Sequence, residues 1–154
     1  VQRRGYDQSL WLDPIEMKYI EELSGMNFFI LQNGELHTPK LNGSFLAGIT
    51  RDSIISLARH KGITVVERDI AIQEVLTGIQ SGAVSEIFAC GTAAIVSPVS
   101  VIADADGTNY AVNKVDELAA TLRQSLLAIQ EQREVDPFSW TQEVAEQYSP
   151  AYIE

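Results

Sequence analysis

The sequence has little of what marks secreted or membrane-spanning proteins. Its single cysteine, Cys90, excludes an internal disulfide and is typical of a reducing compartment, so we expect a cytoplasmic protein. The longest apolar runs, such as residues 93–96, are far too short to cross a bilayer. Residues 1–4 lead directly into polar sequence without the pattern of a secretory signal. We therefore expect no membrane partner.

Basic residues are also scarce. Eleven Lys and Arg residues against 21 Asp and Glu residues give a formal net charge of -10 at pH 7. Nucleic-acid phosphates need a basic footprint on the protein, so this balance argues against a nucleic-acid partner. A small anionic ligand is compatible with the charge, because backbone amides can hold a phosphate without net positive charge. We predict no metal site.

The 154 residues, 45% hydrophobic and 21% charged, are typical of one globular domain. Asn33-Gly34 and Asp106-Gly107 are hairpin signals between apolar segments. Alternation of strands with helices predicts an α/β or α+β domain with a mixed sheet. Strands are expected at 9–12, 26–31, 35–38, 63–68, 86–90, 94–101 and 110–112.

Three helices are expected between these strands. The first follows Gly48, with Thr50 or Asp52 as its cap and Gly62 at its end. The second covers 72–79 and ends near Gly82. The third, of roughly four turns, carries an apolar stripe. That stripe consists of Val115, Leu118, Ala119, Leu122, Leu126 and Ile129.

Beyond the third helix we expect Phe138 and Trp140 to anchor a tail. Residues 143–154 of this tail are expected to be loose or docked on a partner.

The start of the first helix carries one candidate for ligand chemistry. Gly48 precedes it, and the amides of Ile49, Thr50 and Arg51 lack partners inside a helix that begins there. The helix macrodipole adds partial positive charge, so this end can bind a phosphate even in an acidic protein. The alternative, favoured on this segment alone, is a simple helix start capped by Thr50.

Two further segments are individually ambiguous. Gly91 ends an apolar strand, and Thr92 offers a hydroxyl and an amide next to small residues; the alternative is a tight connection with a buried threonine. Glu21 and Glu22 precede an aromatic strand and would point to opposite sides if extended. An inward carboxylate would suit a protonated heterocycle, and the alternative is two solvated charges.

Together the three segments resemble one family. Glu-Glu-Leu-Ser-Gly-Met-Asn at 21–27, Gly-Ile-Thr-Arg-Asp-Ser at 48–53 and Gly-Thr-Ala-Ala at 91–94 are similar, in order and separation, to branched-chain aminotransferases of fold type IV, which depend on pyridoxal 5'-phosphate (PLP). The likeness covers Gly5 to Trp140. It implies the C-terminal large domain of such an enzyme, a mixed sheet or pseudo-barrel with flanking helices at 1–140, followed by a tail at 141–154.

The resemblance also implies roles for particular residues. The activity would be transfer of an amino group between leucine, isoleucine or valine and 2-oxoglutarate, in branched-chain amino acid biosynthesis. A carboxylate on the pyridine nitrogen would keep the PLP ring protonated. By the family pattern, Glu22 takes that position, the Ile49 and Thr50 amides and the Thr92 hydroxyl hold the cofactor phosphate, and the Gly25 and Ala93 amides receive the substrate carboxylate.

The sequence departs from the family pattern in a few places. Ser24 stands where the family usually has glycine, and the segment after 129–130 lacks the usual glycine. Ala93 and Ser97 occupy positions where some animal relatives carry a redox-active cysteine pair. We therefore expect no such switch, with Cys90 acting as a small buried hydrophobe.

The catalytic lysine is expected upstream of Val1. None of Lys18, Lys40, Lys61 or Lys114 has the sequence context of the lysine that holds PLP covalently in the family. The phosphate-gripping arginine and the N-terminal small domain would also lie upstream. We therefore name no catalytic residue in the chain and predict that it is inactive alone.

Other interpretations stay open. D-amino-acid aminotransferases and aminodeoxychorismate lyases share the fold and hold PLP similarly, and a non-catalytic remnant that binds phosphate ligands is a further alternative. The implied partners are small amino acids and 2-oxo acids. A homodimer, or association with the missing N-terminal part, is expected from the family.

Overall fold

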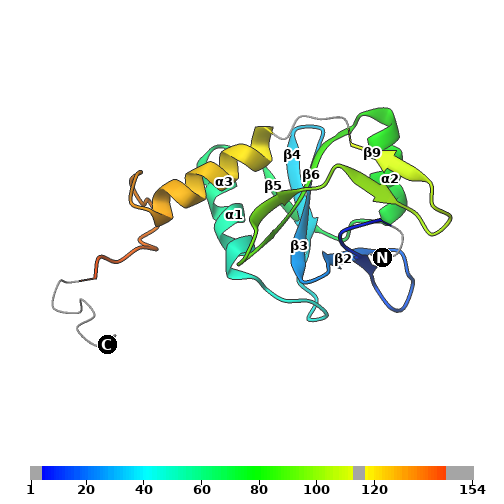
Figure 1. Ribbon diagram of the computed structural model, residues 1–154, viewed down its shortest axis with the longest axis horizontal. Coiled ribbons are helices and arrows are strands. Elements are labelled where there is room, and N and C mark those ends of the chain that lie inside the picture. The colour runs from blue at the N-terminus through cyan, green and yellow to red at the C-terminus, as the bar shows by residue number, and fades with distance from the viewer. Residues whose placement is uncertain (1–4, 113–116, 145–154) are drawn as a thin grey trace.

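The computed structural model describes residues 5–112 and 117–144. This part of the chain forms a seven-stranded sheet, a separate two-stranded sheet and three helices (Figure 1). The strands are β1 (Leu10–Leu12), β2 (Ile20–Leu23), β3 (Met26–Gln32), β4 (Glu35–Pro39), β5 (Val65–Arg68), β6 (Val84–Gly91), β7 (Ile95–Pro98), β8 (Val101–Ala103) and β9 (Asn109–Ala111). The helices are α1 (Ile49–His60), α2 (Ile72–Ser81) and α3 (Glu117–Gln130).

Strand β3 organises the large sheet. One of its edges pairs along its length with β6, which in turn pairs with β7. The other edge pairs with β2 at the start of β3 and with β4 at its end. Only β4 and β5 run parallel within this sheet, so the sheet is mixed, as expected from the sequence. The expected flanking helices are confirmed too.

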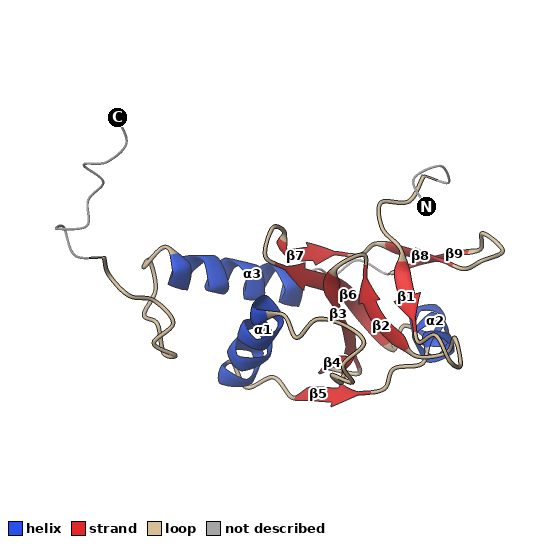
Figure 2. Cartoon of the chain, turned by 90° about the horizontal axis from the view of Figure 1, so that it is seen from below, coloured by secondary structure: helices blue, strands red, loops and turns tan. Residues whose placement is uncertain are grey.

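Two apolar clusters cover opposite faces of the sheet, because successive side chains of a strand point to opposite sides. Phe28 and Ile30 of β3 pack with α2 and the β8–β9 hairpin. Phe29 packs on the other side with α1 and α3, where its ring stacks on Phe88 with centroids 5.1 Å apart. Figure 2 shows α1 and α3 together at one side and α2 at the other.

The helix ends follow local signals, with one exception. Gly62 and Gly82 adopt the left-handed conformation immediately beyond α1 and α2, as expected. The expected cap by Thr50 or Asp52 is wrong, because Gly48 is the N-cap and no side chain bonds there. Thr50 and Asp52 lie inside the first turn instead.

The expected single strand at 94–101 is also wrong. The chain leaves β6 after Pro98, which has no N–H to continue a ladder. The Val99 N–H still bonds the Ile87 carbonyl at 2.8 Å, whereas Ser100 accepts from Val112 at 2.9 Å. The segment therefore changes sheets, and β8 pairs with β9 as a separate hairpin.

The tail beyond α3 is anchored by its aromatic residues, as expected. Phe138 stacks on Trp140 with ring centroids 4.1 Å apart and meets His60 of α1 edge-on at 5.4 Å. Asp136 accepts hydrogen bonds from the Phe138 and Thr141 amides at 2.9 and 2.7 Å, which closes this turn. The expectation for 143–154 falls largely on residues 145–154, outside the described part. None of the three described helices has the length and apolar character of a membrane span.

Candidate functional site

Two turns meet where β3 begins and β6 ends. Asn27 of β3 lies opposite Cys90 of β6 in the antiparallel register. The β2–β3 turn at Gly25 therefore lies beside the β6–β7 turn that follows Gly91. A Cβ atom added at Gly91 would lie 3.4 Å from the Met26 Cγ and 3.8 Å from the Gly25 carbonyl oxygen. The chain segments carrying Gly25 and Thr92 are thus in direct proximity.

Helix α1 begins against the same end of the sheet. The side-chain amide of buried Asn27 donates a hydrogen bond to the Leu46 carbonyl at 2.9 Å, in the segment leading into α1. A Cβ atom at Gly48 would collide with the Asn27 Oδ1. Only glycine permits this close approach, so Asn27 and Gly48 together fix where α1 starts. The anchoring function of Asn27 was not foreseen from the sequence.

The first turn of α1 presents unused backbone donors. The first intrahelical hydrogen bond runs from the Asp52 N–H to the Gly48 carbonyl at 3.1 Å. The N–H groups of Ile49 and Thr50 precede it and have no intrahelical acceptor. The Ile49 side chain is 87% exposed, so solvent or a ligand can reach this end. The backbone amides of this first turn and the positive end of the helix macrodipole together favour binding of an anion.

The turn between β6 and β7 is accessible as well. Thr92 and Ala93 are both exposed. Within the described residues, the Thr92 hydroxyl has no hydrogen-bond partner. The alternative of a buried threonine in a tight connection is therefore wrong. The hydroxyl is free to donate to or accept from a ligand.

The two adjacent glutamates of β2 have different surroundings. Glu21 accepts a hydrogen bond from the Ser44 hydroxyl at 2.6 Å, whereas Glu22 bonds to no side chain or amide of the described residues apart from the strand ladder. Burial, followed by the nearby negative charge of Glu21, raises the pKa of Glu22. Both glutamates are partly exposed, so the structure does not decide between a ligand-binding carboxylate and the alternative of two solvated charges. The carboxylate of Glu22 remains available to a cationic or hydrogen-bonding partner.

Glu22 faces the same side of the sheet as the start of α1. It lies directly opposite Asn27 in the β2–β3 ladder. Residues directly opposite in an antiparallel pair place their side chains on one face. Because Asn27 reaches the segment before α1, the Glu22 carboxylate belongs to that face. The structure thus gathers all six predicted binding residues around one end of β3 and β6, on three turns and one strand.

The lysines of the described residues lie elsewhere. Lys18 lies over the Tyr19 ring at 4.8 Å, and Lys40 pairs with Asp69 at 2.6 Å. Lys61 follows the end of α1 that is remote from Gly48. Lys114 falls outside the described residues. No described lysine therefore belongs to the three turns, and the upstream lysine stays a prediction.

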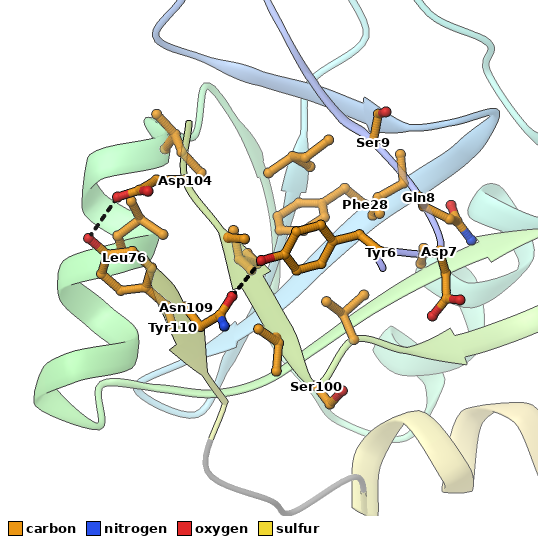
Figure 3. A pocket seen from close by; sticks show the side chains of 18 of the residues that line it. Tyr6, Asp7, Gln8, Ser9, Phe28, Leu76, Ser100, Asp104, Asn109 and Tyr110 are labelled. Atoms are coloured by element: carbon orange, nitrogen blue, oxygen red, sulfur yellow. Dashed lines mark hydrogen bonds between the residues drawn. The ribbon is translucent and has the colours of Figure 1, made fainter. Parts of the chain in front are cut away.

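A sizeable cavity lies on the opposite face of the sheet and was not anticipated. It measures about 980 Å³, and Phe28 and Leu76 contribute to its walls. Figure 3 shows Tyr6 reaching across it to Asn109, whose Oδ1 accepts a 2.8 Å hydrogen bond from the tyrosine hydroxyl. None of the six predicted binding residues lines this cavity. Its residues come from segments far apart in the chain, so no local signal in the sequence could have revealed it.

Comparison with known proteins gives consistent matches. The family model for class IV amino-transferases matches residues 1–102. The chain is 47% identical over 145 residues to branched-chain-amino-acid aminotransferase 2 of Bacillus subtilis (strain 168), covering 94% of this chain and 40% of the relative. It is 43% identical over 141 residues to a branched-chain-amino-acid aminotransferase of Mycolicibacterium smegmatis, covering 88% and 38%.

Solved structures agree with these relatives. The branched-chain amino acid aminotransferase from Escherichia coli superposes with a TM-score of 0.75 at 31% identity, covering 91% of this chain and 44% of that one. The branched-chain aminotransferase from the thermophilic archaeon Thermoproteus uzoniensis, solved with norvaline, gives a TM-score of 0.72 at 29% identity, covering 87% and 40%. The chain thus spans less than half the length of each of these relatives. It belongs to the class IV aminotransferase family.

Proposed function

We propose that this chain is the cofactor-holding part of a PLP-dependent branched-chain aminotransferase. The parent protein would transfer the amino group between leucine, isoleucine or valine and 2-oxoglutarate. The observation that carries the proposal is the convergence of the Gly25 turn, the start of α1 and the Thr92 turn at one end of the β3–β6 pair. Relatives named as branched-chain-amino-acid aminotransferases support it.

The donors and acceptors at this end of the sheet fit PLP. The amides of Ile49 and Thr50 and the hydroxyl of Thr92 have no partner among the described residues, and they suit the three acceptor oxygens of a phosphate. Glu22, whose pKa is raised by burial, would be stabilised as a carboxylate by a protonated ring nitrogen. When bound, PLP supplies an electron sink that the amino acid side chains of a protein lack.

The substrate carboxylate would lie between the two neighbouring turns. Gly25 and Ala93 are both exposed, and their turns touch through Gly91. Their amides would orient the substrate by hydrogen bonding its carboxylate, while Glu22 holds the proton on the cofactor ring. The chain would thereby position both reactants and leave proton transfer at the substrate carbon to the upstream lysine.

The remaining features of the proposal concern the rest of the protein. Residues 1–140 form the C-terminal cofactor-holding domain and 141–154 a tail, with a small domain and the lysine upstream. A homodimer, or association with that upstream part, would complete the site, and the protein would be cytoplasmic. Absence of described lysines from the three turns also keeps the non-catalytic, phosphate-ligand-binding alternative open for this chain alone.

Binding of pyridoxamine 5'-phosphate to the purified 154-residue chain tests the site, because this form of the cofactor needs no lysine. Glu22→Gln and Thr92→Val should each weaken binding by about tenfold, equivalent to ~1.4 kcal/mol. The matched controls are Thr121→Val and Glu143→Gln, both exposed and away from the site, and they should bind as the unaltered chain does. Undetectable binding to the unaltered chain, or equal loss in all four variants, would contradict the proposal.

Covalent trapping tests the missing lysine. After incubation with equimolar PLP and borohydride, peptide mapping of the 17.0 kDa chain should find only scattered, substoichiometric labelling of surface amines. A stable added cofactor on one specific lysine would refute the claim that the covalent residue lies upstream. Turnover of branched 2-oxo acids and glutamate by the 154-residue chain should likewise be undetectable. Assays of the full protein with D-amino acids and with aminodeoxychorismate would distinguish the other activities of the family.

A further inference from the structure

Arg51, in the first turn of α1, is almost completely buried. Only 4% of its surface is exposed, whereas most arginines lie at the protein surface. Its Nη2 donates to the Pro39 carbonyl at 3.0 Å and to the Glu67 Oε2 at 2.9 Å. Pro39 ends β4 and Glu67 belongs to β5, so one guanidinium ties the helix start to two parallel strands.

This is an unfavourable place for a cation when only helix stability matters. The amino-terminal end of a helix is its positive end, so acidic residues are stabilising there and basic residues are not. Burial adds a desolvation cost, and the buried Arg51 Nε–H has no hydrogen-bond partner among the described residues. The Glu67 carboxylate is shared with Arg59, which donates to it at 3.3 Å. The compensation for the Arg51 charge is therefore incomplete.

The surroundings of Arg51 point to a use for its charge. The Arg51 side chain lies in the same helical turn as the Ile49 and Thr50 amides. The Arg51 Cβ lies 3.8 Å from the position of a Cβ at Gly48, and Gly48 abuts Asn27, which pairs with Cys90 near the end of β6 that precedes the Thr92 turn. The buried charge of Arg51 thus belongs to the region where both segments that would hold the cofactor phosphate meet.

We propose that Arg51 is a positioning residue, which clamps the first turn of α1 to the ends of β4 and β5 and adds positive potential beneath the phosphate site. The inference rests on the proposed function, because the anion it serves is the cofactor phosphate. Arg51 does not touch the reacting atoms. Its effect is confined to ligands that carry the phosphate group.

Pyridoxamine with and without the 5'-phosphate separates this function from a purely structural one. Arg51→Met keeps most of the buried volume but removes the charge and the donors. It should weaken binding of pyridoxamine 5'-phosphate by at least tenfold, and change binding of unphosphorylated pyridoxamine less than twofold. Arg51→Lys keeps the charge without the planar fork and should weaken binding of the phosphorylated ligand by about threefold.

The matched control is Arg59→Met, because Arg59 shares Glu67 but lies at the far end of α1 with its side chain 54% exposed. It should change neither affinity by more than twofold. Equal weakening of both ligands by Arg51→Met, or equal loss in Arg59→Met, would overturn the proposal. If Arg51→Met shows no cooperative thermal transition, the Arg51→Lys variant provides the test instead. The proposal is overturned if Arg51→Lys binds both ligands as the unaltered chain does, or binds both more weakly by the same factor.

Failure of the cofactor proposal is recognised separately. If the unaltered chain binds neither ligand, the cofactor site itself is wrong. In that case inorganic phosphate titrated into the ¹⁵N-labelled chain reports on the anion site alone, through the amide resonances of Ile49, Thr50 and Thr92. Phosphate-induced shifts that Arg51→Lys weakens and Arg51→Met abolishes would support the function of Arg51 toward an anion. Absence of such shifts in the unaltered chain would overturn it.

Discussion

Asn27 of β3 donates a 2.9 Å hydrogen bond to the Leu46 carbonyl, 19 residues further along the chain. The same side chain fills the space that a Cβ atom at Gly48 would need. This one residue therefore connects the sheet to the start of α1, whose free amides are the candidate phosphate donors. Positioning of the site therefore depends on this buried amide in addition to the contacts of Arg51.

Asn27→Ala should destabilise the chain and loosen the start of α1. Loss of the donor leaves the Leu46 carbonyl without its partner, which should lower the free energy of unfolding by about 1–3 kcal/mol. Urea denaturation at pH 7 measures the change. Gln80→Ala, an exposed amide on α2, is the matched control and should differ from the unaltered chain by less than ~0.5 kcal/mol. An unchanged midpoint for Asn27→Ala would show that other contacts, such as those of Arg51, hold the start of α1 without Asn27.

Glu86 gives a second prediction, for the opposite end of β6. This buried carboxylate accepts hydrogen bonds from the Leu118 and Ala119 amides of α3, both at 3.0 Å. It acts as an N-terminal cap supplied by a strand more than 30 residues away, and it complements the helix dipole. Glu86→Gln keeps the shape but removes the charge and one acceptor, so unfolding should become easier by about 1–3 kcal/mol.

The control for Glu86 is Glu143→Gln, an exposed carboxylate near the end of the described chain, which should leave the urea midpoint unchanged. Backbone hydrogen exchange adds a local readout, because the first turn of α3 should exchange faster in Glu86→Gln while α2 is unaffected. Uniform protection across both helices would contradict the capping function.

Features determined by local chemistry were predictable from the sequence. Gly62 and Gly82 end helices because they adopt left-handed backbone conformations, and Asn33-Gly34 closes a hairpin for the same reason. The apolar stripe centred on Leu122 recurs at helical spacing, so α3 was expected; Val115, the first residue of that stripe, lies outside the described residues. Resemblance to a family supplied the identity of the candidate site residues.

Features determined by contacts between distant segments were not predictable. Glu86 reads as a polar residue of a strand, and nothing near it in sequence indicates that it caps α3. From the sequence alone Arg51 would be predicted to lie on the exposed surface of a helix, and only its contacts with Pro39 of β4 and Glu67 of β5 show that it is buried. The 94–101 strand was wrong because periodicity cannot tell where a continuous apolar run changes its pairing partner.

His37 predicts a pH dependence of stability. The Arg68 Nε donates to the His37 Nδ1 at 2.9 Å, an arrangement that requires this nitrogen to be unprotonated. Burial, and then the Arg68 charge, lower the pKa of His37 below its ordinary 6.5. The unfolded chain therefore binds more protons near pH 6, so stability should fall as the pH decreases from about 7 through the folded pKa.

His37→Asn keeps an acceptor for Arg68 but cannot titrate, so its stability should vary less between pH 7 and pH 5. Urea denaturation at several pH values measures the slope. His60→Asn, which removes the other histidine of the chain, serves as the control and should retain the slope of the unaltered protein. A slope that survives His37→Asn would assign the pH dependence to other groups, such as Glu74, which also pairs with Arg68.

Glu22 predicts a conflict between stability and ligand binding. Burial and the neighbouring Glu21 raise the pKa of Glu22 above its ordinary 4.5, so the folded state favours the protonated acid. The relative stabilisation is present at low pH and is lost as the pH rises through the folded pKa. At pH 7 the carboxylate is therefore a destabilising charge, retained at the position where a protonated ring nitrogen would pair with it.

Glu22→Gln should accordingly be more stable than the unaltered chain at pH 7, and the difference should shrink as the pH falls below 4.5. The same variant should bind pyridoxamine 5'-phosphate more weakly, so the two measurements move in opposite directions. Glu143→Gln should alter neither. A Glu22→Gln chain that is less stable at pH 7 would mean that the carboxylate stabilises the fold itself. Its position would then no longer argue for a cationic partner supplied by a ligand.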